Sequence, residues 1–167
     1  MLLVWAASQY KIMQILLNKD TSFRHKAAFG KRIEHYIIGL MLKKGLDCYI
    51  PMVDDDKIDV VIKKQNGEFI EVQIKAMSKD NQVQNMANFT ALVHPEIRKN
   101  YYFVFYSEYF DKYWILSSEE FINKSTEVKT GKNKGKRCIK FNYVKNKKPE
   151  TLDALEQFCH SDFKPFF

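Results

Sequence analysis

The chain has 167 residues, enough for one domain with a substantial hydrophobic core. Aromatic residues make up 14% of it, with only 6 Gly and 4 Pro, and this composition excludes an intrinsically disordered chain. Its formal net charge of +7 favours polyanionic partners. Because Cys48, Cys138 and Cys159 lack the spacing of a zinc site or a disulfide framework, we expect a reduced, cytoplasmic environment.

Residues 1–22 begin with an apolar run and predict a packed N-terminal helix. No basic segment precedes the run, and Gln9, Tyr10 and Lys11 interrupt it, so it does not read as a signal peptide. It is also too short and too polar to cross a bilayer, and we expect no membrane association. The helix either docks onto the domain or contacts a second copy of the chain, as in a homodimer.

A second helix is predicted from about Phe23 to Lys44, capped by Thr21-Ser22 and ended by Gly45. Glu34 borders its apolar stripe, so it is either an ordinary boundary residue or faces a compensating group such as a metal. Lys31 and Arg32 make the first half of this helix basic, and we expect them to face a phosphate backbone.

The segment Ile58–Ala76 predicts a β-hairpin, preceded by a short strand at residues 46–51. Apolar and polar residues alternate on both sides of Gln65-Asn66-Gly67. Only a three-residue loop, with Gly67 in the left-handed conformation, brings the two apolar faces together, because a slip by one residue turns every side chain over. In this register Asp59 lies opposite Gln73, and Lys75 is one diagonal step away.

The polar residues of the hairpin suit a hard divalent cation, which prefers carboxylate and carbonyl oxygens. Asp59 and Gln73 both offer oxygen, and a nearby lysine can orient a water molecule and stabilise charge on a phosphate. The alternative is a half-exposed strand face on which Glu71, Gln73 and Lys75 are solvated.

Asp59, the Gln73-Ile74-Lys75 triplet after a short hairpin, and the helical acid Glu34 resemble the PD-(D/E)xK nuclease superfamily. The resemblance covers roughly residues 23–116. It implies a restriction-endonuclease-like fold and Mg²⁺-dependent phosphodiester hydrolysis, with Mn²⁺ as a substitute. Gln73 stands where the family usually has an acid, as in the Q-x-K variant of some intron homing endonucleases, and no proline directly precedes Asp59.

By this resemblance Asp59, Gln73 and Glu34 would bind metal, with Glu71 as a reserve ligand. Lys75 would position the nucleophile and, with Asp59, Gln73 and Glu34, make up the catalytic set.

Residues 77–95 are polar and ambiguous in secondary structure, and residues 78–81 predict a loop beside the site. Aromatic and β-branched content predicts buried strands at residues 100–106 and 113–116. Ser117 or Ser118 then caps a short helix. This order of elements predicts an α/β fold, with a mixed β-sheet core flanked by helices.

Residues 129–148 carry nine basic residues and no acid. Without these nine, 18 of the 27 basic residues remain against 20 acids, so the positive balance of the chain lies in this segment. Such clustering predicts a basic hairpin that contacts DNA, and the alternative is a solubilising surface. The nucleic-acid-binding candidates in it are Lys129, Lys132, Lys134, Lys136, Arg137 and Lys140.

A final helix is predicted from Pro149 to about His160. The tail of Phe163, Phe166 and Phe167 either packs on the core or contacts a partner.

The sequence thus predicts a single domain, residues 1–167, that acts as a metal-dependent DNA endonuclease. The alternatives are a catalytically weak or inactive nucleic-acid-binding module and an interaction subunit on the same fold.

Overall fold

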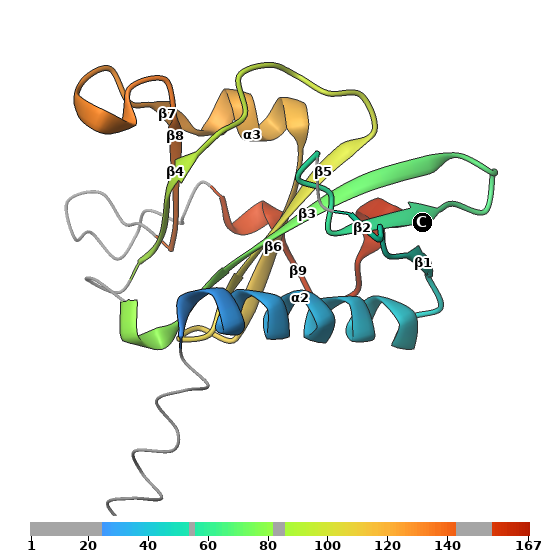
Figure 1. Ribbon diagram of the computed structural model, residues 1–167. Helices are drawn as coiled ribbons and strands as arrows, with labels where there is room; N and C mark the ends of the chain where they lie inside the picture. Colours follow the sequence, from blue (N-terminus) through green and yellow to red (C-terminus); the bar gives the residue numbers. More distant parts are fainter. Residues whose placement is uncertain (1–24, 54–55, 82–85, 143–154) are drawn as a thin grey trace, which may run out of the picture.

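The computed structural model describes residues 25–53, 56–81, 86–142 and 155–167. Among these residues, a mixed six-stranded sheet has helix α2 on one face, and a three-stranded sheet and helix α3 on the other (Figure 1). The α/β class and the mixed sheet expected from the sequence are confirmed. The large sheet has the order β1-β2-β3-β5-β6-β9, and the small sheet the order β4-β8-β7. The helices and strands are α2 (Lys26–Lys43), β1 (Asp47–Tyr49), β2 (Val60–Lys63), β3 (Phe69–Met77), β4 (Ala87–Leu92), β5 (Tyr101–Ser107), β6 (Lys112–Ser117), α3 (Ser118–Lys124), β7 (Thr126–Glu127), β8 (Arg137–Phe141) and β9 (Cys159–His160).

Helix α2 packs its apolar stripe onto the large sheet. The stripe repeats at helical spacing, and its most deeply buried members are Ile37 and Met41. Gly45, at φ +86°, ends the helix as predicted: its N–H donates to the Leu42 carbonyl, and the Leu46 N–H donates to the Met41 carbonyl. The helix begins at residue 26, later than expected, and the predicted Thr21-Ser22 cap lies outside the described residues.

The β2–β3 hairpin has the predicted three-residue loop. Lys63 pairs with Phe69 across the strands, and the Lys64 N–H donates to the Glu68 carbonyl, which leaves residues 65–67 in the loop. Gly67 has φ +85°, in the left-handed region where a side chain is unfavourable. The register deduced from the apolar alternation is therefore confirmed.

Strand β3 lies at the centre of the large sheet, antiparallel to β2 and parallel to β5. Ile70, Val72 and Ile74 belong to the core beneath α2, whereas Met77 belongs to the core beneath the small sheet. Since side chains alternate along a strand, Glu71, Gln73 and Lys75 share the face of Met77. The polar residues of the hairpin therefore lie on the face away from α2.

The small sheet was not expected. Residues 77–95, whose secondary structure the sequence left open, contain the 3₁₀ turn η2 (Lys79–Asn81) and strand β4, which pairs with β8. An irregularity in the β4–β8 pairing lies between Phe89 and Leu92, where Ala91 has φ +59°. Strand β8 lies within the predicted basic hairpin, and Ser117 caps α3 in a capping box with Glu120.

The C-terminal segment differs from its prediction at the described end. The helix expected to reach His160 is wrong there, because residues 156–158 form a 3₁₀ turn and Cys159–His160 pair with β6. Phe163 and Phe166 are almost fully buried in the core beneath α2, which decides for packing over a partner contact for these two. The predicted N-terminal helix (1–22), residues 143–148 of the basic segment and the start of the last helix lie outside the described residues.

No helix in the described part of the chain is both long and apolar enough to cross a membrane.

Candidate functional site

The site predicted on the hairpin is organised where β2 begins. Backbone N–H groups point alternately to the two sides of a strand. The Glu71 N–H points to the β5 side of β3, where it donates to the Asn100 carbonyl. The Ile74 N–H, three residues later, therefore points to the β2 side. Strand β2 starts only at Val60, and the Asp59 carboxylate takes the place of a backbone partner: its Oδ2 accepts from Ile74 N at 2.6 Å. Asp59 is only 9% exposed. The fold therefore fixes one oxygen of a buried carboxylate and directs the side chain to the edge of β3.

Gln73 lies beside this carboxylate. The pairing of β2 with β3 ends at Val60 and Val72, and the Asp59 N–H donates to the Val72 carbonyl at 2.9 Å, one residue before Gln73. Gln73 is 5% exposed, and its side chain makes no hydrogen bond within the described residues. Buried amides normally have partners, so this amide is available to a group outside the protein.

Lys75 is half-buried and follows on the same face of β3, two residues after Gln73. In the part of the chain that the structure describes, its ammonium has neither a hydrogen bond nor an ion pair. Asp59, Gln73 and Lys75 thus form one polar group at the edge of β3.

The two other predicted acids are engaged elsewhere. Glu71 Oε2 lies 2.6 Å from Arg98 Nη2 in an ion pair. Glu34 Oε2 is buried and lies 2.7 Å from Lys31 Nζ, within α2 on the opposite face of the sheet. Among the described residues, neither acid is bonded to Asp59 or Lys75, and no cluster of three His, Cys, Asp or Glu side chains is present.

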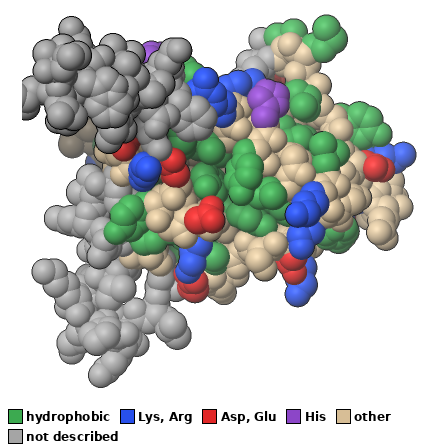
Figure 2. All heavy atoms as spheres, turned by 90° about the horizontal axis from the view of Figure 1, so that it is seen from below, with side chains coloured by type: hydrophobic (Ala, Val, Ile, Leu, Met, Phe, Trp, Pro, Cys, Tyr) green, Lys and Arg blue, Asp and Glu red, His purple; other side chains and the backbone are tan. Residues whose placement is uncertain are grey.

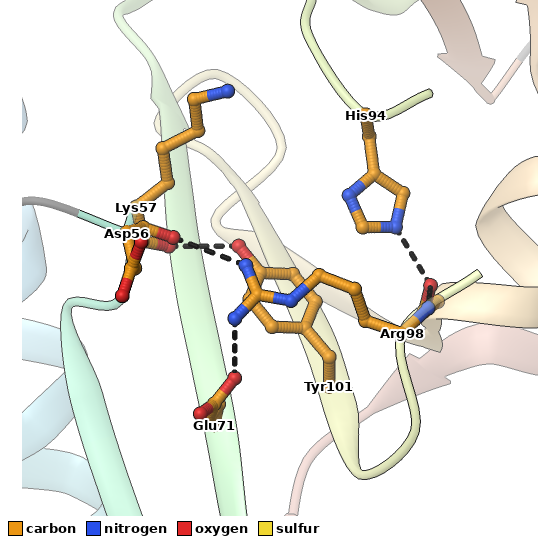
Figure 3. A network of polar contacts seen from close by, with 7 residues as sticks. Asp56, Lys57, Glu71, His94, Arg98 and Tyr101 are labelled. Atoms are coloured by element: carbon orange, nitrogen blue, oxygen red, sulfur yellow. Dashed lines mark hydrogen bonds and ion pairs between the residues drawn. The ribbon is translucent and has the colours of Figure 1, made fainter. Parts of the chain in front are cut away.

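A polar network that the sequence did not indicate lies next to the site (Figure 3). Arg98 and Tyr101 contact the backbone just before Asp59, and His94 lies behind them. No sequence spacing pointed to these residues, because Arg98 and Tyr101 lie 42 and 44 positions along the chain from the backbone groups that they contact.

The nucleic-acid-binding candidates fall on two sides of the sheet. Lys31 and Arg32 are exposed on α2. The face seen from the α2 side carries side chains of both charges, separated by apolar ones (Figure 2), so it is not a continuous basic surface. The β7–β8 connection lies above the sheet (Figure 1), and Lys129, Lys132 and Lys134 are exposed there.

Arg137 has a different role from that predicted. Its Nε donates to Ser125 Oγ at 2.7 Å, and its Nη2 donates to the carbonyl of Ile122 at 2.6 Å. These acceptors lie at the C-terminal end of α3, where carbonyls lack helical partners and a cation is favoured. Lys136 donates to Asn133 Oδ1, and Lys140 is exposed on β8.

Comparisons with known proteins bear on the fold. No family model and no curated protein matches the chain. Among solved structures, the chain is similar to a bacterial homing endonuclease, I-Ssp6803I, with a TM-score of 0.51. The alignment has 17% identity and covers 81% of this chain and 88% of that chain. The chain therefore shares its mixed α/β fold with that protein.

Proposed function

We propose that the chain is a metal-dependent DNA endonuclease with its site at Asp59, Gln73 and Lys75. The proposal rests on three side chains near the start of β2, where this strand leaves the edge of β3 uncovered. They are the buried carboxylate of Asp59, the buried amide of Gln73, which makes no hydrogen bond within the described part of the chain, and Lys75, which is in no ion pair there. The likeness in fold to a protein named a homing endonuclease supports nuclease chemistry for this group.

The residues present fit a hard divalent cation such as Mg²⁺ or Mn²⁺. Asp59 Oδ2 is held by Ile74 N–H, so the carboxylate is fixed at the edge of β3, where it would be the first donor. The carbonyl oxygen of Gln73 is the second donor, and the carbonyl of Ile74 points to the same edge as its N–H. A bound cation would polarise a phosphoryl oxygen and increase the acidity of a bound water.

Lys75 would act on the phosphate and on the water. In phosphodiester hydrolysis a water oxygen forms a bond to phosphorus, the bond to one ester oxygen breaks, and that oxygen takes a proton. The Lys75 ammonium can hydrogen-bond the attacking water and offset the negative charge that grows on the phosphoryl oxygens. Lys75 is half-buried, so fewer water molecules screen its charge than would screen an exposed lysine, and both effects are stronger.

Glu34 and Glu71 are held outside this site, Glu34 on the α2 side of the sheet beside Lys31 and Glu71 in its ion pair with Arg98. The Oε2 atom of Glu34 is buried and lacks a hydrogen bond of good geometry, which leaves it able to hold a water or a second ion. For Glu71 the partner is a guanidinium at 2.6 Å, so a role as reserve ligand would cost that contact.

DNA is the substrate that the charge distribution favours. The exposed lysines on the β7–β8 connection, with Lys140, give a cationic outer surface to the layer that contains the small sheet. Phosphate contacts from such lysines position a duplex without reading its sequence.

Plasmid nicking in Mg²⁺ and in Mn²⁺ tests the proposal. We expect metal-dependent nicking by the wild type and a loss of about 100-fold or more in Asp59→Ala and in Lys75→Ala. Asp47→Ala and Lys63→Ala remove exposed residues of the same types from neighbouring strands and should retain the activity. Nicking that survives both site substitutions would refute the assignment.

A catalytically weak DNA-binding module on the same fold is the second candidate. It is favoured by the neutral Gln73, because a site with fewer carboxylates attracts a divalent cation less strongly. Gln73→Glu separates the two cases. A gain in nicking would indicate a live but attenuated site, whereas DNA binding without nicking in both proteins would favour the module.

A further inference from the structure

The turn that delivers Asp59 is held in an unusual conformation. Lys57, two residues before Asp59, has φ +58°, a left-handed value that is unfavourable for a residue with a side chain. Its carbonyl accepts from the hydroxyl of Tyr101 at 2.7 Å, and its own Nζ donates to the carbonyl of Val93 at 3.2 Å. Because such a backbone persists only where its surroundings determine it, these contacts fix the direction in which the chain enters β2.

Arg98 holds the preceding residue of the same turn. Its Nη1 donates to the carbonyl of Asp56 at 3.1 Å, and its Nη2 pairs with Glu71 on β3 at 2.6 Å (Figure 3). The guanidinium carbon lies 4.1 Å from the centre of the Tyr101 ring. One planar group thus bridges the turn before Asp59 to the strand that carries Gln73, which a lysine with a single ammonium cannot reproduce.

Arg98 is itself anchored from behind. Its backbone N–H donates to Ser118 Oγ at 2.8 Å, and the same oxygen lies 2.6 Å from His94 Nε2. Ser118 is 1% exposed and begins α3, so the loop that carries Arg98 rests on a rigid element. The guanidinium is therefore placed by the fold.

We propose that Arg98 and Tyr101 are positioning residues, a latch that sets the Asp59 carboxylate by fixing the carbonyls of Asp56 and Lys57. This latch gives Glu71 a role as the anchor of Arg98 on β3, in place of a reserve metal ligand. The link to metal binding rests on the function proposed above. The effect of the latch can be measured without metal, through the hydrogen bond from Ile74 N–H to Asp59.

The test compares three variants of the full chain. Tyr101→Phe removes the hydroxyl that holds the Lys57 carbonyl, and Arg98→Lys keeps the charge but loses the bridge. Tyr106→Phe is the matched control: it lies on the same strand, is also buried, and loses a hydroxyl contact to Asp111 at 3.0 Å. A general loss of stability should be similar in the two tyrosine variants.

The first readout is hydrogen exchange of the Ile74 amide in metal-free protein, followed by NMR. Its rate is taken relative to the Val72 amide on the same strand, which removes the effect of global unfolding. We expect a relative rate at least about tenfold faster in Tyr101→Phe and Arg98→Lys, and unchanged in Tyr106→Phe. An unchanged relative rate in both latch variants would overturn the proposal.

The second readout is Mn²⁺ affinity by titration calorimetry. We expect about tenfold weaker binding in both latch variants, as for other residues that orient a metal ligand, and wild-type affinity in Tyr106→Phe. Equal weakening in all three proteins would contradict a positioning role. If the wild type binds no Mn²⁺ while Ile74 exchange responds as expected, the proposed metal site fails and the latch stands.

Discussion

Lowering the pH from about 7 to about 5 is expected to destabilise the folded chain through His94. This side chain is 5% exposed and lies between Tyr101, at 5.3 Å between ring centres, and Phe103, at 4.9 Å. The Arg98 N–H already donates to Ser118 Oγ, which leaves the serine hydroxyl hydrogen for His94 Nε2. A neutral imidazole accepts this hydrogen at Nε2. A protonated imidazole would carry a hydrogen of its own on Nε2 and could not accept the bond.

The size of the effect follows from the pKa of His94. Burial lowers this pKa from 6.5 to about 4, and the positive charges of Arg98, Lys57 and Arg137 act in the same direction. Above pH 6.5 neither the folded nor the unfolded histidine carries a proton, and the stability is fully present. Between 6.5 and 4 the unfolded state alone gains a proton, so stability is lost as the pH falls. The complete loss is about 3 kcal/mol, of which about 2 kcal/mol occurs by pH 5.

Urea unfolding of the wild type and of His94→Gln, at several pH values from 7 to 5, measures this contribution. Glutamine does not titrate, so the difference between the two proteins cancels the other ionisable groups. We expect the advantage of the wild type to shrink by about 2 kcal/mol across this range. A difference that stays constant with pH would show that His94 titrates normally in the folded chain, and the account of its surroundings would be wrong.

Further predictions concern Arg137, Gln73 and the exposed lysines. Arg137→Met should lower the free energy of unfolding by about 2 kcal/mol in urea, because its hydrogen bonds satisfy carbonyls at the end of α3. Gln73→Met should raise the free energy of unfolding by about 1 kcal/mol, because it removes a buried amide without a partner, and should weaken Mn²⁺ binding in calorimetry. Changing Lys129, Lys132 and Lys134 together to Gln should weaken DNA binding, measured by fluorescence anisotropy. The slope of log affinity against log salt concentration should fall in magnitude by about 3.

The Arg137 and lysine predictions have matched controls, and the Gln73 prediction has a contrary outcome. Lys136→Met removes a neighbouring cation that contacts only a side chain and should change stability little. For Gln73, a destabilised Met variant would mean that the amide has a partner in solution. For the lysines, the exposed Lys43, Lys44 and Lys63 changed together to Gln should leave the salt slope unchanged, and an equal effect of both triple variants would indicate nonspecific charge.

The register of the hairpin could be predicted because a period-two alternation admits few loop lengths. With Ile62 and Ile70 both required in one core, only a loop that pairs Lys63 with Phe69 is consistent. The glycine at residue 67 supplies the left-handed residue that such a loop needs. The same register predicted Asp59 opposite Gln73, and in the structure the Asp59 N–H donates to the Val72 carbonyl, one residue before Gln73.

The burial of that pair could not be predicted in the same way. It depends on the layer that contains β4 and β8, and β4 is a short strand with an irregular pairing near Ala91, so its alternation is broken. The prediction of a helix up to His160 was wrong for a related reason. Leu155 and Phe158 do lie at helical spacing, yet the backbone of Cys159 and His160 gains hydrogen bonds by pairing with β6, and this tertiary contact outweighs local propensity.

The second layer, which the sequence did not predict, changes how the polar residues of β3 are interpreted. On an open strand face, Gln73 would be hydrated and its presence would need no explanation. Under a second layer its side chain is 5% exposed and makes no hydrogen bond among the described residues, so its amide loses most of its contact with water without gaining a protein partner. A methionine would fill a similar space without an amide to desolvate. The amide of Gln73 is therefore not required by the fold, and the bonds that would offset its desolvation are those to a ligand.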